Sequence, residues 1–349
     1  MAAQYGLRAR DAAGVVTLDT TVTPIRSLKL LTVTGNGAFD QYVSIPEIKA
    51  QSFVVVDALA NNGENTWSPR AWWTDGQLQL RQPSSQAWQV MVLSQGGEPF
   101  SAPGSYGIRA TNNNVRTQID AVNKVLSVAS SGQFQFGQMG PGNYVQWAHV
   151  DFPAPVATYE RPLVFFNPEN YLMAGNFYIK GGPGAWTGFA VKAYANATAH
   201  GSIAQSPMTV KWLCASYQAP VGPVGQYGAR VRDASGVLTF HTSINLAALN
   251  GQPAVNSFYN SSNPITGAGY YATGYQMGWT NSAADYFLAN AVLSCTNIFQ
   301  TAQPIRANFG GFLPNRRDVL QMYCDNSSGI DPVTPNGRTL FAARPVKPI

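Results

Sequence analysis

Charged residues are scarce in this chain. Asp, Glu, Lys and Arg make up 11% of its 349 residues, whereas an average soluble domain contains about 25%. Disordered segments are rich in charge and poor in aromatic residues, so a sequence with 12% Phe, Trp and Tyr is not of that class. Exposed helix faces need Lys, Glu and Arg, so the composition also argues against a helical protein. The 33 Gly and 23 Pro favour β-strands joined by turns.

Long apolar runs and basic runs are also lacking. No stretch approaches the roughly 18 apolar residues of a membrane span, so we expect no membrane insertion. Arg316-Arg317 is the only basic doublet, and the net charge of +5 is dispersed, so we expect no binding to nucleic acid. The segment 1–5 has no basic stretch followed by an apolar core, and we expect a protein made in the cytoplasm without a signal peptide.

Cysteine and histidine are too few for a metal or disulfide framework. The odd number and wide spacing of Cys214, Cys295 and Cys324 exclude a dense set of disulfides. Cys214 lies in an apolar strand-like run and is expected to be a buried free thiol, whereas the pairing of Cys295 with Cys324 stays open. His149 and Asp151 would lie on one strand face, but further ligands are not identifiable. We therefore expect neither a metal nor a cofactor.

Catalytic motifs are missing too. The sequence has no Gly-x-Ser-x-Gly, His-Glu-x-x-His or Walker motif. The run 267–272 formally resembles a dinucleotide fingerprint, but no clear strand precedes it and no helix follows. We predict a protein that is not an enzyme and has no catalytic residues. A carbohydrate-active enzyme or depolymerase remains an alternative, because the two carboxylates of a glycosidase meet only in space.

One phrase of about fifteen residues is present three times, and it is the most informative feature of the sequence. The first copy covers 4–18, the third covers 226–240, and a weaker middle copy covers 105–117. Their tyrosines are roughly 100 to 120 residues apart, the size of a small domain. We predict an all-β chain of three tandem antiparallel β-sandwich modules with short Pro/Gly linkers. The expected bounds are 1–103, 104–224 and 225–349, the third module being the most diverged.

The phrase has the chemistry of a β-hairpin. Asp11 precedes Gly14 as Asp233 precedes Gly236, and each pair separates two β-rich runs. Asp can bond the backbone of a turn, and Gly supplies a positive φ. Because the phrase recurs, its shared residues are interpreted as structural. They are Tyr5, Gly6, Asp11, Gly14, Tyr106, Gly107, Tyr227, Gly228, Asp233 and Gly236.

Apolar runs inside the modules indicate where buried strands lie. The segments 53–56 and 163–166 are continuously apolar and are expected to align as buried central strands. Strands are also expected near the end of each module, at 87–93, 208–215 and, more loosely, 338–343. The segment 283–293 is predicted to form one or two helical turns.

A group of aromatic residues in the third module is the best candidate for a ligand site. Aromatic faces beside amide side chains suit sugar rings, which offer apolar C–H faces and hydroxyl edges. The Gly, Ser and Asn content of 259–281 predicts an exposed loop. A core role for these aromatics is the competing interpretation. The candidate glycan or receptor contacts are Tyr270, Tyr271, Tyr275, Trp279 and Asn260.

The opening phrase is similar to a known signature. The run 5–8 followed by 11–19 resembles the N-terminal signature of small β-rich virion proteins of tailed bacteriophages. In the third copy His241 stands where the first has Asp19. The resemblance implies a structural, non-enzymatic part of a phage tail: a tail tip, baseplate or tail fibre. It implies contacts with other tail proteins, homo-oligomers in a symmetric assembly, host attachment through a bacterial surface glycan, and location in the virion. A free-standing lectin is a further alternative.

Overall fold

The protein is almost entirely β-structure, as expected from its composition. The computed structural model contains 26 strands and one short helix, α1 (Ala289–Val292), within the residues that it describes. All the strand pairs are antiparallel, which confirms the all-β antiparallel fold class. The described residues are 8–10, 14, 16–19, 24–49, 52–59, 69–81, 83–94, 107–112, 115–120, 124–139, 145–169, 173–194, 207–217, 228–249, 257–259, 270–276, 285–294, 297–299, 306–313, 316–325 and 342–345.

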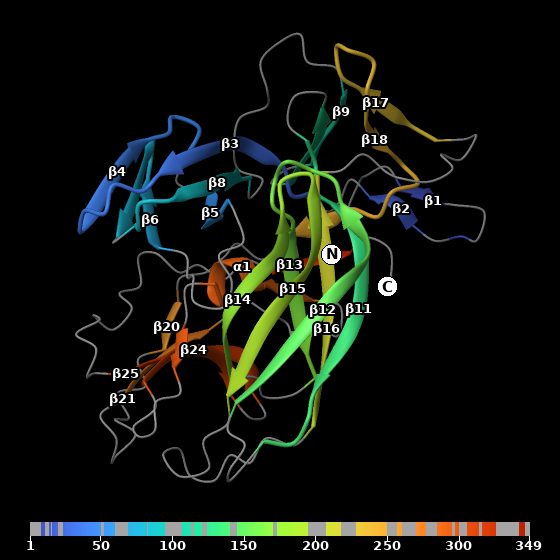
Figure 1. Ribbon diagram of the computed structural model, residues 1–349. Coiled ribbons are helices and arrows are strands. Elements are labelled where there is room, and N and C mark those ends of the chain that lie inside the picture. Colours follow the sequence, from blue (N-terminus) through green and yellow to red (C-terminus); the bar gives the residue numbers. More distant parts are fainter. Residues whose placement is uncertain are drawn as a thin grey trace.

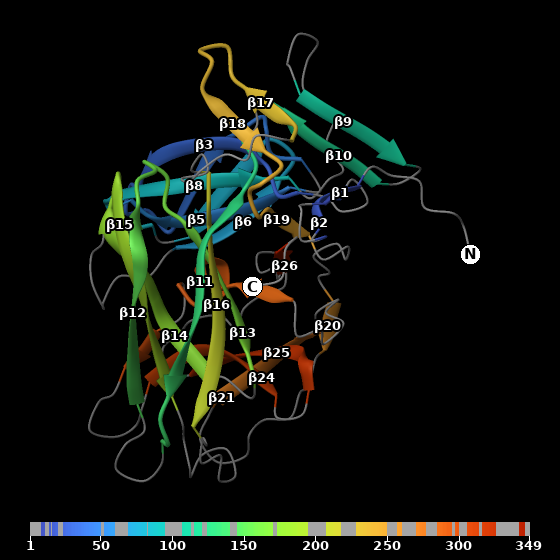
Figure 2. The same cartoon turned by 90° about the vertical axis from the view of Figure 1, so that its right-hand side faces the viewer.

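Each copy of the repeated phrase forms a two-stranded hairpin, which confirms that prediction. The hairpins gather in the upper part of Figure 2. Apolar residues of the second and third hairpins, among them Ile119 and Phe240, pack in one cluster. The paired strands are β1 (Arg8–Arg10) with β2 (Val16–Asp19), β9 (Gly107–Asn112) with β10 (Val115–Asp120), and β17 (Arg230–Arg232) with β18 (Leu238–His241).

The turn of the third hairpin works as its sequence predicts. Oδ1 of Asp233 accepts hydrogen bonds from the backbone N–H groups of Ser235 (2.9 Å) and Val237 (2.8 Å). Gly236 has a φ of 79°, in the left-handed region that a Cβ disfavours. The side-chain carboxylate and the glycine therefore fix the reversal together.

The first and third hairpins share further details. Gly14 also has a φ of 79°, and Arg10 donates a hydrogen bond to its carbonyl (2.6 Å) as Arg232 does to the carbonyl of Gly236 (2.7 Å). The pairing register shifts at the same step, before Arg10 and before Arg232. Of the other predicted structural residues, Gly107 begins β9 and Gly228 has a φ of 138°. Tyr5, Gly6, Asp11, Tyr106 and Tyr227 lie outside the described residues.

After its hairpin, each copy contributes three strands to an inner sheet in the same order. In each copy, the first of these strands in the sequence pairs with the last one, and the last one pairs on its other side with the second. In the three copies these are β3 (Ser27–Thr34), β8 (Ala87–Leu93) and β5 (Phe53–Ala58); β11 (Ser127–Phe136), β16 (Met208–Ser216) and β13 (Leu163–Pro168); and β19 (Ala247–Leu249), β26 (Ala342–Pro345) and β22 (Tyr286–Leu288).

The outer sheets repeat a second common order. They are β4 (Asp40–Ser44), β7 (Gln77–Arg81) and β6 (Arg70–Thr74); β12 (Val145–Val156), β15 (Ala185–Tyr194) and β14 (Met173–Gly182); and β21 (Tyr270–Gln276), β25 (Arg316–Asp325) and β24 (Arg306–Leu313). β20 (Ser257–Tyr259) and β23 (Asn297–Phe299) add to the third set. In the first two copies, inner and outer sheets enclose an apolar core between them.

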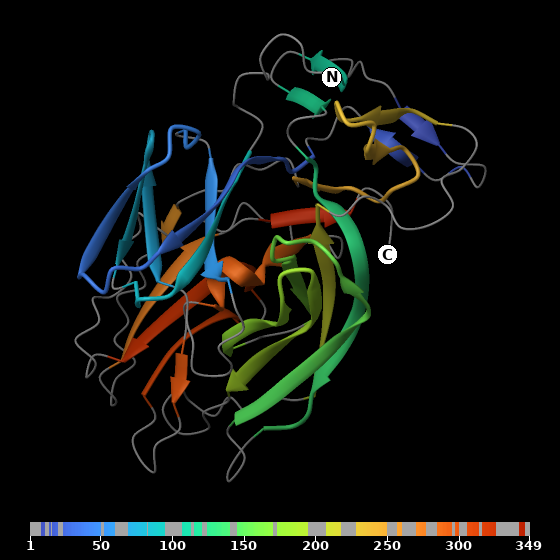
Figure 3. The same cartoon turned by 45° about the horizontal axis from the view of Figure 1, so that its top comes forward.

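The sheets of the second and third copies are continuous with each other. β13 pairs with β22 and β14 pairs with β24, so both layers run from one copy into the next. The segment 283–293, expected to be helical, enters this junction as β22 before the single turn α1. The three copies surround a common centre, blue, green and orange in Figures 1 and 3.

The middle inner strands β5 and β13 are buried on both faces, which explains their continuous apolar runs. Val54 and Val56 of β5 point into the core of the first copy, whereas Phe53 and Val55 point into a cluster shared by all three copies. The same alternation places Phe165 of β13 in the shared cluster. Because both faces of these strands meet apolar neighbours, their sequences do not alternate between apolar and polar residues. The burial predicted for 53–56 and 163–166 is confirmed, although β5 lies at the end of its three-stranded sheet.

A closed ring of backbone hydrogen bonds joins the three copies at the start of their inner sheets. The N–H of Ile25 donates to the carbonyl of Ala247 (3.1 Å). The N–H of Ala247 donates to the carbonyl of Leu126 (3.0 Å), whose own N–H donates to the carbonyl of Ile25 (2.8 Å). Each copy thus donates to one neighbour and accepts from the other.

The ring residues occupy equivalent positions. Each is the twentieth residue after the tyrosine of its copy, counting from Tyr5, Tyr106 and Tyr227. The isolated β-bridges that flank the ring follow the same cyclic order. In each bridge, the residue just before the ring residue of one copy pairs with the residue just after the ring residue of another copy. The pairs are Pro24 with Ala248, Val125 with Arg26, and Leu246 with Ser127. The three copies therefore meet about an approximate threefold axis.

The division of the chain into modules with bounds at 103 and 224 stays a prediction, since both bounds lie outside the described residues. The structure adds that the three segments are not separate units. They share one apolar cluster, one hydrogen-bonded ring and, for the second and third, two sheets.

We expect Phe165→Ala to destabilise the whole chain in one transition. Phe165 is fully buried in the shared cluster, and truncating such a side chain costs about 3–5 kcal/mol. Circular dichroism and tryptophan fluorescence should give the same shifted melting curve. Tyr159→Ala, at an exposed position, is the control. Separate melting steps, of which only one shifts, would contradict a shared core.

We expect Gly236→Ala to destabilise the protein by about 1–2 kcal/mol, because alanine is strained at positive φ. Gly182 provides the matched control. An added Cβ meets nothing within 4 Å at either position, and of the two only Gly236 has a positive φ. Denaturant unfolding of both variants measures the difference. Equal effects would show that φ is not the cause.

Candidate functional site

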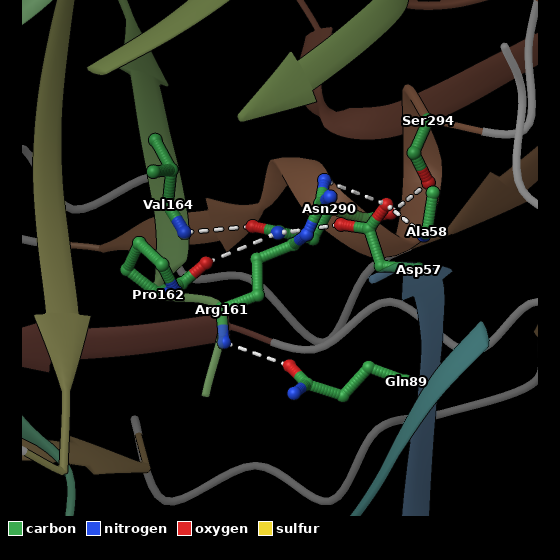
Figure 4. Close-up of polar contacts among 8 residues, drawn as sticks. All are labelled: Asp57, Ala58, Gln89, Arg161, Pro162, Val164, Asn290 and Ser294. Carbon is green, nitrogen blue, oxygen red and sulfur yellow. Dashed lines mark hydrogen bonds and ion pairs between the residues drawn. The ribbon is translucent and has the colours of Figure 1, made fainter. Parts of the chain in front are cut away.

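A buried polar cluster lies where the three copies meet, and Figure 4 shows it. Asp57 comes from β5, Arg161 directly precedes β13 with Pro162, and Asn290 lies on α1. Nη1 of Arg161 is 3.3 Å from Oδ1 of Asp57. Nδ2 of Asn290 donates to Oδ2 of Asp57 at 3.1 Å. One carboxylate of the first copy thus binds both other copies.

Backbone groups complete the cluster. Oδ1 of Asn290 accepts from the N–H of Val164 (2.7 Å), and its Nδ2 donates to the carbonyl of Pro162 (3.2 Å). The N–H of Arg161 donates to Oε1 of Gln89 in β8 (2.7 Å). These contacts link residues far apart in the chain and fix how the inner sheets are placed.

The cluster is sealed from solvent. Arg161 is 2% exposed and Asp57 is 3% exposed. Burial lowers the pKa of Arg161, and the negative charge of Asp57 opposes that shift. The guanidinium also lies 5.0 Å from the ring of Trp186. Such an arrangement can hold the segments together but offers a ligand no access.

The outer face of the β4–β7–β6 sheet is the better candidate for binding. Its other face packs on the core of the first copy through Leu78 and Leu80. Side chains alternate along strands, so Gln79 projects outward between them. In the registers of the sheet Gln79 pairs with Tyr42 on one side and with Trp72 on the other. This row places an amide between two aromatic residues.

An arginine orders the aromatic side chains of this face. The guanidinium of Arg81 lies 4.7 Å from the ring centroid of Phe39 and 5.1 Å from that of Trp72. Its Nε is 3.2 Å from Oδ1 of Asp40. Phe39 and Tyr42 are 60% and 59% exposed, unusually open for large apolar rings.

The equivalent face of the second copy carries aromatic residues in a closed arrangement. Trp147 and His149 of β12 stack at 5.7 Å, and Trp147 meets Tyr178 of β14 edge-on at 6.2 Å. Nζ of Lys192 lies 5.4 Å from the Trp147 ring. The rings therefore contact one another.

His149 and Asp151 project from the same face, as expected. Asp151 pairs with Lys180, and this hydrogen bond lowers the pKa of the carboxyl group. Within the described part of the chain no group of three or more His, Cys, Asp or Glu could hold a metal ion. No described helix is long and apolar enough to cross a membrane.

Cys214 is a buried free thiol, as predicted. Burial raises its pKa, because the thiolate would lose its hydration. This cysteine is therefore inert. Cys324 lies in β25, and Cys295 is outside the described residues.

The predicted glycan contacts are brought together only in part. Tyr270, Tyr271 and Tyr275 lie in β21, between β20 and β25, so this stretch is a strand and not the expected exposed loop. Trp279 and Asn260 are outside the described residues. β21 holds the same place in its outer sheet as β4 does in the first.

Sequence reasoning missed Tyr42, Gln79 and Arg81. The pairing of β4 with β7 brings Tyr42 beside Gln79, and the crowding of Trp67, Trp72 and Trp73 was the only visible signal. No family model, curated protein or solved structure was found to match this chain.

We expect Asp57→Asn to cost about 3–5 kcal/mol, because it leaves the charge of Arg161 buried without a counter-ion. Glu47→Gln is the control: Glu47 pairs with Lys29 near the surface, where loss of an ion pair costs about 1 kcal/mol or less. Urea unfolding of both variants is the measurement. Equal losses would show that the Asp57 charge does not hold the junction.

Proposed function

We propose that this chain is a structural, non-enzymatic component of a bacteriophage tail, placed at the tail tip, baseplate or a tail fibre. It acts through contacts with other tail proteins and contacts a glycan of the host envelope. The resemblance of the repeated phrase to virion proteins motivates the proposal, and it involves no catalytic step or cofactor.

The observation that carries the proposal is the ring of Ile25, Leu126 and Ala247. It arranges three equivalent segments of one chain about an approximate axis, as three subunits are arranged in a cyclic trimer. A chain with this internal threefold arrangement fits a symmetric assembly, in which the same contact is formed once by each equivalent segment. Rigidity supports a mechanical role: the shared cluster and the Asp57–Arg161 pair resist separation of the copies.

The proposed location and partners follow from this role. The protein is made in the host cytoplasm, assembles with other tail proteins and with copies of itself, and leaves the cell in the virion. Its low charge and its Gly-rich, aromatic composition suit surfaces that contact proteins over wide areas.

A free-standing lectin is the second candidate, and the exposed aromatic face of β4–β7–β6 is the observation that favours it. The two functions differ in where the protein is found. A tail component copurifies with particles in fixed stoichiometry, whereas a free lectin stays in the soluble fraction.

We expect an antibody against the full chain to label the tail of purified phage particles in electron microscopy. Particles made without the gene for this chain are the control and should stay unlabelled. Absence of label and of the protein from intact particles, with the protein present in the soluble lysate, would contradict the tail assignment.

A further inference from the structure

We propose that the outer face of the β4–β7–β6 sheet, centred on Tyr42, Gln79 and Trp72, binds a neutral saccharide. This inference rests on the proposed function, in which the chain contacts a host glycan, and it assigns that contact to one site. The site lies on the first copy, away from the predicted residues of the third.

The spacing of the two aromatic residues suits a sugar ring. Tyr42 and Trp72 both pair with Gln79, one from each neighbouring strand. Neighbouring strands are about 4.8 Å apart, so the backbones that carry the two aromatic residues are separated by about 10 Å. A sugar ring that sits between them can present its C–H groups to the aromatic residues and its hydroxyls to the amide of Gln79.

The polar residues of the face suit a neutral ligand. Of the charged residues on its three strands, Asp40 and Arg81 pair with each other, and Arg70 of β6 lies opposite Arg81 in the register. The neighbouring cross-strand row consists of Ser44, Gln77 and Thr74, all exposed. Hydroxyl and amide groups of this kind exchange hydrogen bonds with sugar hydroxyls, whereas an acidic sugar would have to compete with Asp40 for the guanidinium.

Arg81 prepares the site for binding. Its contacts with Phe39, Trp72 and Asp40 restrict the side chains before a ligand arrives. Less conformational entropy is then lost on binding, which favours affinity on an open surface.

The second copy offers an internal comparison. There Trp147 reaches toward Tyr178 and stacks on His149, so its rings fill the space between the outer strands with one another. Its central strand has Ala190 opposite His149 and Tyr178, in place of an amide. This face is built from the equivalent strands β12, β15 and β14 and carries similar residue types. Its rings leave no gap for a sugar ring, so we expect it not to bind a saccharide.

The test uses the full-length chain and an array of neutral and acidic bacterial surface polysaccharides, followed by titration calorimetry with oligosaccharides of the bound class. We expect binding to neutral saccharides that is insensitive to salt. Trp72→Ala should weaken it about tenfold, the effect of losing one aromatic contact, and Trp147→Ala should leave it within about twofold. Circular dichroism checks the fold, and Tyr42→Ala, at an exposed position, replaces Trp72→Ala if that variant is unfolded.

Three results would overturn the proposal: no binding to any saccharide on the array, equal weakening by Trp72→Ala and Trp147→Ala, or a preference for acidic saccharides that salt abolishes. None of them affects the labelling of particles, so a failure of this site and a failure of the tail assignment can be told apart.

Discussion

The hydrogen-bonded ring of Ile25, Leu126 and Ala247 is the constraint on which the architecture depends. It fixes the starting points of three inner sheets around one centre. From there the inner faces must meet, and their apolar residues form the shared cluster. Because the opposite faces already close the sandwiches, the middle strands β5 and β13 are apolar on both sides. The low charge of the sequence is thus partly a consequence of this geometry.

The threefold arrangement is incomplete, and polar residues mark where it breaks. The runs 53–57, 163–167 and 286–290 end in Asp57, Asn167 and Asn290, all buried. Asn167 donates to the carbonyl before β22, and Asn290 donates to the carbonyl before β13, so these two copies exchange equivalent bonds across their paired strands.

The first copy differs at this position. In the described sheets β5 has no inner strand of another copy beside it. There a carboxylate replaces the amide, and Asp57 receives Arg161 from the second copy and Asn290 from the third. The change from amide to acid thus suits the copy whose described sheets continue into neither of the other two.

Local chemistry made part of this structure predictable. The hairpins follow from Asp233 and Gly236, whose effect on a turn is contained within five residues. The ring was not predictable, because it consists of backbone groups that every residue carries. The candidate face required the register that sets Tyr42 beside Gln79. Sequence spacing does not contain that register, so aromatic clustering pointed to the third copy instead.

Covalent continuity between the copies has a further consequence. Three separate subunits around such a ring would fall apart on dilution, and each would have to be identical to the others. In one chain the effective concentration of each copy for its neighbours is set by the tether. One copy can then change without the others. His241 occupies the place of Asp19, and the outer face of the first copy exposes Phe39 and Tyr42 whereas the rings on the equivalent face of the second copy contact one another. A single gene can in this way present three different surfaces around one axis.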